Sequence, residues 1–318
     1  SQMESLRNSL YVALVKPLLP YIPRQIKNLM IVPDGTLGHL PFDILRENDS
    51  SPDLGLSYRI SFSPSVSVSM LAAQTGIDGL EPLFALGGAW YNRNKTAADR
   101  GELRDIAIAA QSNDAGSGTK ERRWMDLPGT ETEVQNLRRL VSSPNQILAL
   151  FGNEVSEQRI KRMSANGELN KYPIIHFACH GYFDEADADR SGIVLSEVSG
   201  LLGDEEDGYL TIPEIAILDM KSRMVMLSAC ETGLAALKRG DGMVGMARAF
   251  MVAGTENVGV SLWSISDDGA SEFMSRLYGK VIKEGLSFRE AYYQVKQEFR
   301  GDEKWSHPYY WAAFTMYE

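Results

Sequence analysis

The sequence predicts an α/β protein built on a doubly wound, mainly parallel sheet flanked by helices. From residue 83 onward, short apolar runs alternate with segments of helical periodicity, which is the order that builds parallel sheets. Two of these runs, PIIHFA at 173–178 and MVMLSA at 224–229, are mostly apolar and are soon followed by glycine, which is typical of buried parallel strands. Right-handed crossovers would then place helices on both faces of the sheet.

Residues 1–80 are expected to form a smaller N-terminal sub-domain. Residues 6–19 carry apolar side chains at helical spacing and run into two prolines, which predicts a helix that ends there. Residues 28–33 form a short apolar run closed by an Asp-Gly turn, and residues 56–63 alternate as a second strand. Residues 66–73 are expected to form a helix.

Residues 81–318 are expected to form the larger part. Strands are predicted where short apolar runs are bounded by turn residues, at 83–88, 146–151, 173–178, 224–229, 257–263 and 311–316. Helices are predicted where the apolar period lengthens, at 129–140, 156–164, 242–252, 270–284 and 287–299. Thr130 followed by Glu133 has the pattern of a capping box at the start of the first of these helices. The polar segment 91–123 is expected to be a loop, with its most flexible point at 112–118.

Composition narrows the class of protein. Of the 318 residues, 44% are hydrophobic and 23% charged, and the net charge is −10. An acidic chain of this kind lacks the basic surface needed to bind nucleic acid non-specifically. No apolar stretch is long enough for a membrane span, and two cysteines do not make a disulfide framework, so a cytoplasmic protein is expected. Because the chain begins at Ser1 and not at methionine, it is expected to be part of a longer protein.

The candidate chemistry lies at the ends of two predicted strands. His180 follows the strand at 173–178, and Cys230 follows the strand at 224–229. If these strands are neighbours, their carboxyl ends bring imidazole and thiol into one groove. A thiol is a nucleophile only as thiolate, and an imidazole can take its proton and return it to a leaving amine. The backbone amides of Gly181 and Cys230 are candidate donors to an oxyanion.

Other interpretations of the same residues are less favoured. Free cysteines are commonly buried and inert, a role that suits Cys179. His176 lies deeper in its strand and is expected to be a hydrogen-bonded core residue, on the same face as His180. A zinc site built from these residues is disfavoured, because H-x-x-C-H on a strand divides its members between two faces. No metal or cofactor is expected, and the glycine-rich GDGMVG at 240–245 lacks the Lys-Ser/Thr ending of a phosphate loop.

Six segments, in order, resemble the CHAT domain family, a branch of the caspase-like cysteine peptidases related to separase. They are IVPDGTLGHLPFDIL (31–45), LPGTETEV (127–134), IIHFACHGYFD (174–184), LSACETG (227–233), GDGMVGMARAFMVAGTENVGVSLWSISDD (240–268) and HPYYWAAFTMY (307–317). The resemblance implies a caspase-like fold with a pseudo-caspase-like, non-catalytic N-terminal sub-domain at 1–80 and a catalytic domain at 81–318.

The same resemblance implies a cysteine endopeptidase in which His180 is the base and Cys230 the nucleophile. It also implies a protein substrate and a regulatory sensor or repeat module, in cis or in trans, in a bacterial signalling or defence pathway. The competing hypothesis is a catalytically silent scaffold that binds a protein partner without cutting it. Retention of both His180 and Cys230 favours the enzyme.

Residues after the catalytic strands are candidates for substrate binding. The acidic side chains of Glu231, Asp241 and Asp267 would favour a basic residue before the scissile bond, because an unpaired buried carboxylate is costly. Related peptidases often share that preference. Trp263 and Ser264 would line the same groove. The alternative is that the acids cap helices or face solvent, and Asp267 lies where it would suit an N-cap.

Overall fold

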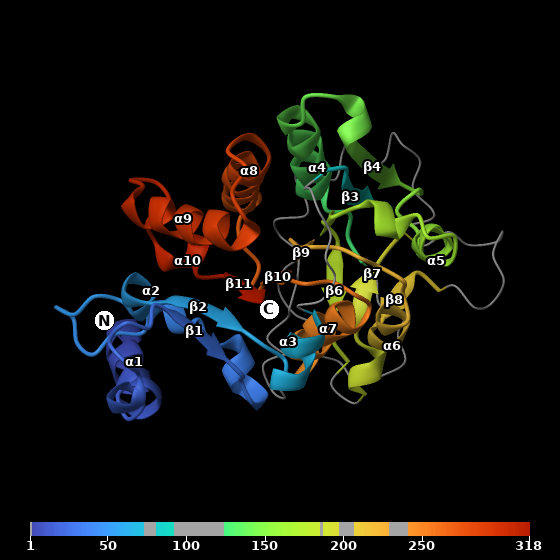
Figure 1. The fold of residues 1–318 in the computed structure, drawn as a ribbon. Helices are drawn as coiled ribbons and strands as arrows, with labels where there is room; N and C mark the ends of the chain where they lie inside the picture. The colour runs from blue at the N-terminus through green and yellow to red at the C-terminus, as the bar shows by residue number, and fades with distance from the viewer. Residues whose placement is uncertain (1, 73–80, 92–123, 185–186, 197–206, 229–240) are drawn as a thin grey trace.

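A computed structural model describes residues 2–72, 81–91, 124–184, 187–196, 207–228 and 241–318, and at 71, 72 and 241 the backbone alone. The loop expected at 112–118 lies outside these residues. Within them, eight strands form one sheet (Figure 1), in the order β1 (Asn28–Ile31), β2 (Arg59–Phe62), β11 (Phe314–Tyr317), β10 (Val258–Ser261), β9 (Met224–Leu227), β5 (Ile174–Phe177), β3 (Leu83–Ala89) and β4 (Ile147–Gly152).

The sheet consists of two parallel blocks that run in opposite directions. Strands β10, β9, β5, β3 and β4 are parallel to one another, and β1, β2 and β11 form the second parallel block. The blocks meet where β11 pairs antiparallel with β10. The predicted α/β class with a mainly parallel sheet is therefore confirmed.

Side chains of the central strands alternate between two hydrophobic clusters. In β5, Ile175 and Phe177 belong to the first cluster and Ile174 belongs to the second. In β9, Val225 belongs to the first cluster and Met224 to the second. Both faces are thus buried, which explains why these strands are apolar along their whole length.

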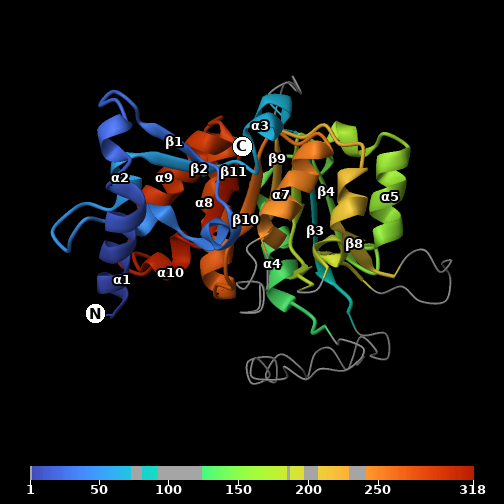
Figure 2. The same cartoon turned by 90° about the horizontal axis from the view of Figure 1, so that it is seen from below.

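Helices cover both faces of the sheet (Figures 1 and 2). The first cluster is covered by α5 (Glu157–Ala165), α6 (Ile212–Ala216) and α7 (Asp241–Val252). The second is covered by α4 (Pro128–Leu140), α8 (Asp267–Lys283) and α9 (Phe288–Gly301). The remaining helices are α1 (Gln2–Leu10), α2 (Leu54–Ser57), α3 (Val66–Ala72) and α10 (Pro308–Trp311). Within the described ranges, no helix is long and apolar enough to cross a bilayer.

A second, three-stranded sheet was not predicted. It is antiparallel and consists of β6 (His180–Tyr182), β7 (Gly192–Val194) and β8 (Tyr209–Thr211). Three-residue strands are too short to show a period of two, so nothing in the sequence distinguishes them from a loop. Because β6 begins at His180, this small sheet decides where the imidazole lies.

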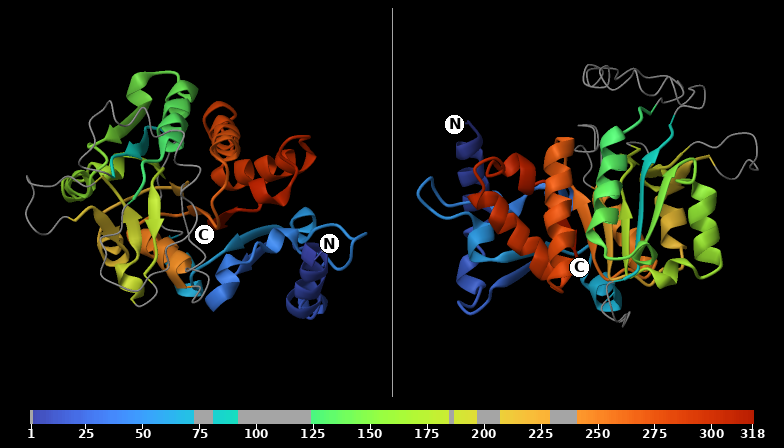
Figure 3. Two further views of the ribbon diagram at one scale, coloured as in Figure 1. Left: turned by 180° about the vertical axis from the view of Figure 1, so that it is seen from behind. Right: turned by 90° about the horizontal axis from the view of Figure 1, so that it is seen from above.

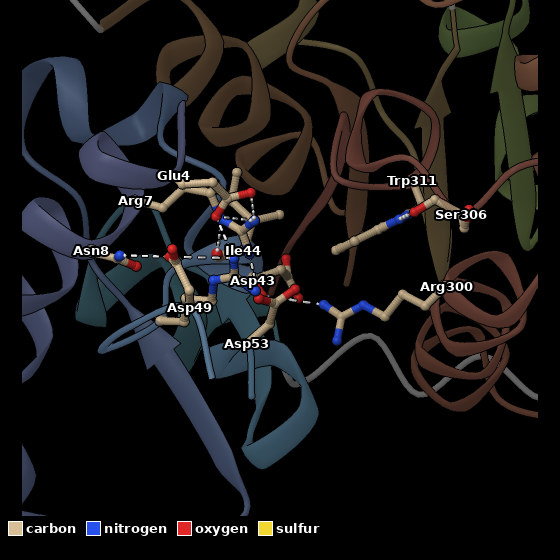
Figure 4. A network of polar contacts seen from close by, with 11 residues as sticks. Glu4, Arg7, Asn8, Asp43, Ile44, Asp49, Asp53, Arg300, Ser306 and Trp311 are labelled. Atoms are coloured by element: carbon tan, nitrogen blue, oxygen red, sulfur yellow. Dashed lines mark hydrogen bonds and ion pairs between the residues drawn. The ribbon is translucent and has the colours of Figure 1, made fainter. Parts of the chain in front are cut away.

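The N-terminal segment is joined to the C-terminal helices by buried charges. The helical turn Phe42–Ile44 carries Asp43, whose carboxylate binds the ammonium of Lys296 in α9 at 2.8 Å. Figure 4 shows the adjoining network, in which Arg7 of α1 binds Asp53 and Arg300 of α9 reaches Asp43. Segments from the two ends of the sequence therefore lie side by side, and the C-terminal strand ends near the middle of the molecule (Figure 3).

Two predicted helix N-caps are wrong. Helix α4 begins at Pro128, so Thr130 lies inside the helix, where its hydroxyl donates to the carbonyl of Leu127 and accepts from the amide of Gly88. Proline is well suited to the first helical position, which moves the start ahead of the supposed capping box. At α8 the N-cap is Ser266, which leaves Asp267 in the first turn and not at the cap.

Candidate active site

The two strands that precede the candidate residues are neighbours. β5 and β9 pair in parallel with Phe177 opposite Leu227, and the amide of Ser228 donates to the carbonyl of Phe177 at 2.9 Å. The segments that follow β5 and β9 therefore leave the sheet side by side at the same edge. Cys230 and Glu231 follow Ser228 but lie outside the described residues.

His180 is buried at this edge, with 1% of its surface exposed. Its Nε2 lies 2.7 Å from the carbonyl oxygen of Met125, and its backbone amide donates to the hydroxyl of Tyr91 at 3.2 Å. Two aromatic rings pack against the imidazole, Tyr91 at 4.7 Å and Trp124 at 5.0 Å between centroids. The ring is thus held by contacts along its edge and against aromatic side chains.

The contact with Met125 fixes the proton on the imidazole. A carbonyl oxygen can only accept a hydrogen bond, so Nε2 must be the donor and must carry a hydrogen. In neutral His180 the lone pair available to a proton is therefore on Nδ1. This is the form in which an imidazole can act as a base while its other nitrogen stays bonded.

Tyr91, Trp124 and Met125 were not among the residues singled out in the sequence. Tyr91 and Trp124 lie at the two ends of the polar segment that the sequence assigns to a loop. Met125 contacts His180 through its backbone carbonyl. Neither kind of contact has a sequence pattern. The only available signal is the concentration of aromatic residues on both sides of a long polar stretch.

Gly181 lies in β6 opposite Ile193 of β7 and is buried. Its backbone is therefore part of the small sheet. Because Gly181 directly follows His180, its amide remains a candidate oxyanion donor, as does that of Cys230.

His176 occupies a separate, closed environment. Its Nδ1 lies 2.9 Å from the Tyr278 hydroxyl, and its Nε2 lies 2.9 Å from the Glu133 carboxylate. All three residues are buried among α4, α8 and β5, and desolvation raises the pKa of Tyr278 well above its ordinary value. His176 is therefore a core histidine, as expected.

The expectation that His176 and His180 share a face is wrong. His176 faces the α4 and α8 side, whereas His180 contacts Tyr91 and Trp124, which pack with the other cluster. The chain leaves the large sheet after Phe177 and starts a new strand at His180, so the alternation of β5 does not continue to it.

Three of the predicted substrate-binding residues lie in or just after the loop that follows β10. The indole of Trp263 donates to the carbonyl of Tyr309 at 3.0 Å, and the carbonyl of Ser264 accepts from the Tyr309 hydroxyl at 3.0 Å. Asp267 begins α8, and Asp241 begins α7, of which only the backbone is described at that residue. The loop is therefore anchored to α10 at the same edge of the sheet as His180.

Asp267 lies against the first turn of α4. A side-chain carbon at Gly129 would lie 2.2 Å from a carboxylate oxygen of Asp267, so only glycine leaves room for this contact. Desolvation raises the pKa of Asp267, and the charges of Glu133 and Asp268 raise it further. The carboxylate thus lies at the carboxyl edge of the sheet, close to other negative charges, in a residue that is exposed to solvent.

No metal-binding cluster of three or more His, Cys, Asp or Glu side chains occurs among the described residues. The argument against a zinc site assumed that residues 176–180 form one strand, but β5 ends at Phe177 and Cys179 lies between β5 and β6. A groove of about 620 Å³ is lined by residues of α2, β2 and α9, among them Arg59 and Tyr293. It contains none of the predicted site residues.

A mainly parallel sheet covered by helices on both faces is the doubly wound α/β class expected from the sequence, and a buried histidine lies just beyond its central strand β5. Residues 4–318 match the CHAT domain. The chain therefore belongs to the CHAT domain family.

Two curated relatives are tetratricopeptide repeat proteins. The chain is 20% identical over 319 residues to human (Homo sapiens) tetratricopeptide repeat protein 28, with 91% of this chain and 12% of the relative covered. It is 27% identical over 107 residues to the mouse (Mus musculus) protein of that name, covering 34% of this chain and 4% of the relative. The chain thus spans a small part of the length of these relatives.

Solved structures with a related arrangement are more distant. The chain is similar to the Saccharomyces cerevisiae separase-securin complex, with 14% identity, a TM-score of 0.49, and 91% of this chain and 15% of that chain covered. It is also similar to gingipain R, an Arg-specific cysteine proteinase, with 10% identity, a TM-score of 0.43, and 82% and 54% covered.

Proposed function

We propose that this chain is a cysteine endopeptidase in which Cys230 is the nucleophile and His180 its base. The observation that carries the proposal is the hydrogen bond from His180 Nε2 to the Met125 carbonyl, which leaves Nδ1 to accept a proton. The pairing of β5 with β9 supports it, because the segments that carry imidazole and thiol leave adjacent strands at one edge.

In the proposed reaction, His180 carries a proton from the thiol of Cys230 to the leaving amine. Nδ1 takes the thiol proton, and the thiolate sulfur attacks the carbonyl carbon of the scissile peptide bond. The imidazolium then returns that proton to the leaving amine as the carbon–nitrogen bond breaks, which leaves a thioester on Cys230. Water, deprotonated by Nδ1, hydrolyses the thioester and restores the thiol.

The surroundings of His180 suit the imidazolium stage. When Nδ1 is protonated, Nε2–H still donates to the Met125 carbonyl, so the ring does not need to rotate between steps. The ring centroids of Tyr91 and Trp124, both tilted relative to the imidazole, lie within the distance at which an aromatic ring attracts a cation. The cation is thus stabilised in an environment from which water is largely excluded.

The acidic edge supports a preference for a basic residue before the scissile bond. Asp267 is a carboxylate with a raised pKa and no cationic partner among the described residues, and an arginine or lysine side chain would relieve the cost of its charge. Glu231 and Asp241 are further candidates in the same region.

The partners follow from the family and from the relatives. We infer that the substrate is a protein and that a repeat or other sensor module, in cis or in trans, regulates cleavage. The names of the tetratricopeptide repeat relatives support the repeat module. A cytoplasmic, bacterial signalling or defence role is part of the same proposal.

Variants of the two cysteines test the proposal. Cys230→Ala is expected to abolish cleavage of a cognate protein without changing the circular dichroism spectrum. Cys179→Ala, a change at a buried cysteine, is the matched control and is expected to keep most activity. His180→Ala should lower the rate at least about 100-fold, the usual contribution of a general base.

Alkylation gives a readout that needs no substrate. Iodoacetamide should label Cys230 at a lower pH than an ordinary thiol requires, and His180→Ala should remove the difference. The proposal fails if Cys179→Ala, and not Cys230→Ala, abolishes cleavage. Cys230→Ala also serves to trap bound proteins for mass spectrometry, which would identify the substrate.

A further inference from the structure

The indole of Trp124 is fixed from both sides. One side packs against the imidazole of His180 at 5.0 Å, and the indole Nε1 donates to the hydroxyl oxygen of Tyr209 at 2.7 Å. Tyr182 closes the group, with its ring 6.1 Å from Trp124 and 5.8 Å from Tyr209. Trp124 therefore has a specific polar anchor in addition to its packing.

The anchor belongs to the same small sheet as His180. Tyr209 is the first residue of β8, and His180 is the first residue of β6. Both strands pair with β7, in which Val194 lies opposite His180 on one side and opposite Tyr209 on the other. The ladder thus holds His180 and Tyr209 at one level, two strands apart, and Trp124 reaches across from outside the sheet. His180 and Tyr209 are thus connected in two ways, through the strand pairing of the small sheet and through the side chain of Trp124.

The residue after Trp124 supplies the acceptor for the imidazole. Because Met125 is bonded covalently to Trp124, fixing the indole also restricts the backbone that presents the Met125 carbonyl to Nε2. On the other side of Met125, the Asp126 carboxylate accepts a hydrogen bond from the backbone amide of Tyr91 at 3.1 Å. The acceptor carbonyl is thus held between two side-chain hydrogen bonds.

We propose that Trp124 and Tyr209 are positioning residues for His180, which hold the Met125 carbonyl against Nε2 and so fix the imidazole tautomer. Their role in catalysis rests on the proposed function. Without the anchor, the segment 124–126 can move away from the ring, and the hydrogen of neutral His180 is then free to occupy either nitrogen. Molecules that carry it on Nδ1 lack the lone pair that the thiol needs.

Two conservative changes remove the same hydrogen bond from opposite ends. Trp124→Phe keeps an aromatic ring against His180 and loses the donor, whereas Tyr209→Phe keeps the ring and loses the acceptor. If the bond is what matters, each single variant and the double variant should have the same effect, because the second change removes nothing further. Tyr278→Phe is the matched control, since its hydroxyl bonds to His176 and not to His180.

Long-range proton–nitrogen NMR of the full chain, labelled with ¹⁵N-histidine, reads the tautomer directly. The chain has 4 histidines, and His180→Gln assigns the relevant pair of signals. At a pH high enough to give neutral imidazole, the native protein should show a protonated Nε2 and an unprotonated Nδ1 for His180. Trp124→Phe and Tyr209→Phe should move both signals toward the average of the two tautomers, and Tyr278→Phe should leave them in place.

The rate of iodoacetamide labelling at Cys230, measured by peptide mapping, is the second readout. Each variant should lower it about 3- to 10-fold, the effect of losing one neutral hydrogen bond. Unchanged His180 signals in both variants would overturn the inference, as would a double variant whose effect is the sum of the singles. If the tautomer shifts as expected but native Cys230 labels no faster than an ordinary thiol, the positioning stands and the proposed protease function fails.

Discussion

The buried ion pair between Lys296 and Asp43 gives a prediction whose size can be worked out from the structure. Their side chains are 2% and 6% exposed, and the charged atoms lie 2.8 Å apart. Desolvation lowers the pKa of Lys296, and the neighbouring Asp43 charge acts in the opposite direction. The Asp43 carboxylate thus offsets part of the cost of burying the lysine, whose ammonium also lies over the Tyr292 ring at 4.6 Å.

Lys296→Met removes the charge and keeps a side chain of similar length. It leaves the Asp43 carboxylate buried and unpaired, which typically costs about 3–5 kcal/mol. Arg300 remains close, with its guanidinium donating to the Asp43 carbonyl at 3.2 Å. We therefore expect Lys296→Met to lower the free energy of unfolding by about 3 kcal/mol, the lower end of that range. The double variant Lys296→Met, Asp43→Asn should recover most of the loss, because neither charge is then buried alone.

Urea unfolding followed by circular dichroism measures these changes. Lys16→Met is the matched control, since Lys16 binds Glu47 at a similar distance of 2.7 Å but both side chains are about half exposed, and no measurable change is expected. A loss below about 1 kcal/mol for Lys296→Met would refute the reasoning. So would a double variant as unstable as the single one.

Two further predictions concern Asp267 and its neighbour. Desolvation and the charges of Glu133 and Asp268 raise the pKa of Asp267, so its charge destabilises the fold at neutral pH, but Asp267 is exposed and solvent screening keeps this penalty small. The penalty disappears as the pH falls and the carboxylate is protonated, so Asp267→Asn should raise the melting temperature slightly at pH 7 and not at acidic pH, while peptide-library profiling shows a weaker preference for Arg and Lys. An equal gain at both pH values would contradict the electrostatic argument. Gly129→Ala should displace the Asp267 carboxylate and raise KM for basic peptides. Gly279→Ala is the control, because a carbon added there meets nothing within 4 Å. It should leave KM unchanged and stabilise the fold by about 0.5–1 kcal/mol. Equal KM values for the two variants would show that the Gly129 contact has no role in substrate binding.

The central strands could be predicted because both of their faces are buried. β5 and β9 lie within one residue or two of the predicted runs, since a strand with two apolar faces has a simple sequence pattern. Their adjacency was left open by the sequence, because periodicity says nothing about which strands pair. The pairing of Phe177 with Leu227 supplies that information.

The surroundings of His180 could not be predicted for a different reason. Trp124 and Tyr209 are brought together by a sheet of three-residue strands, and the Met125 contact uses a backbone atom that every residue has. The sequence therefore indicates only that His180 follows β5, whereas the direction of its imidazole and its tautomer depend on the small sheet and on tertiary contacts. The wrong start of α4 has a local cause, because Pro128 takes the first helical position ahead of Thr130.

The place of β11 in the sheet has a consequence for the order of folding. Among the residues that the structure describes, β1 and β2 join the other block only through β11, which is inserted between β2 and β10 although the other strands of this sheet precede it in the chain. During synthesis on the ribosome, β2 and β10 would both be complete while the strand that bridges them was still to come. The two nascent halves would expose unpaired strand edges during that interval, and such edges readily pair with other chains. A chain that lacked β11 would thus be prone to aggregate, and removal of Phe314–Tyr317 would separate β1 and β2 from the rest of the sheet.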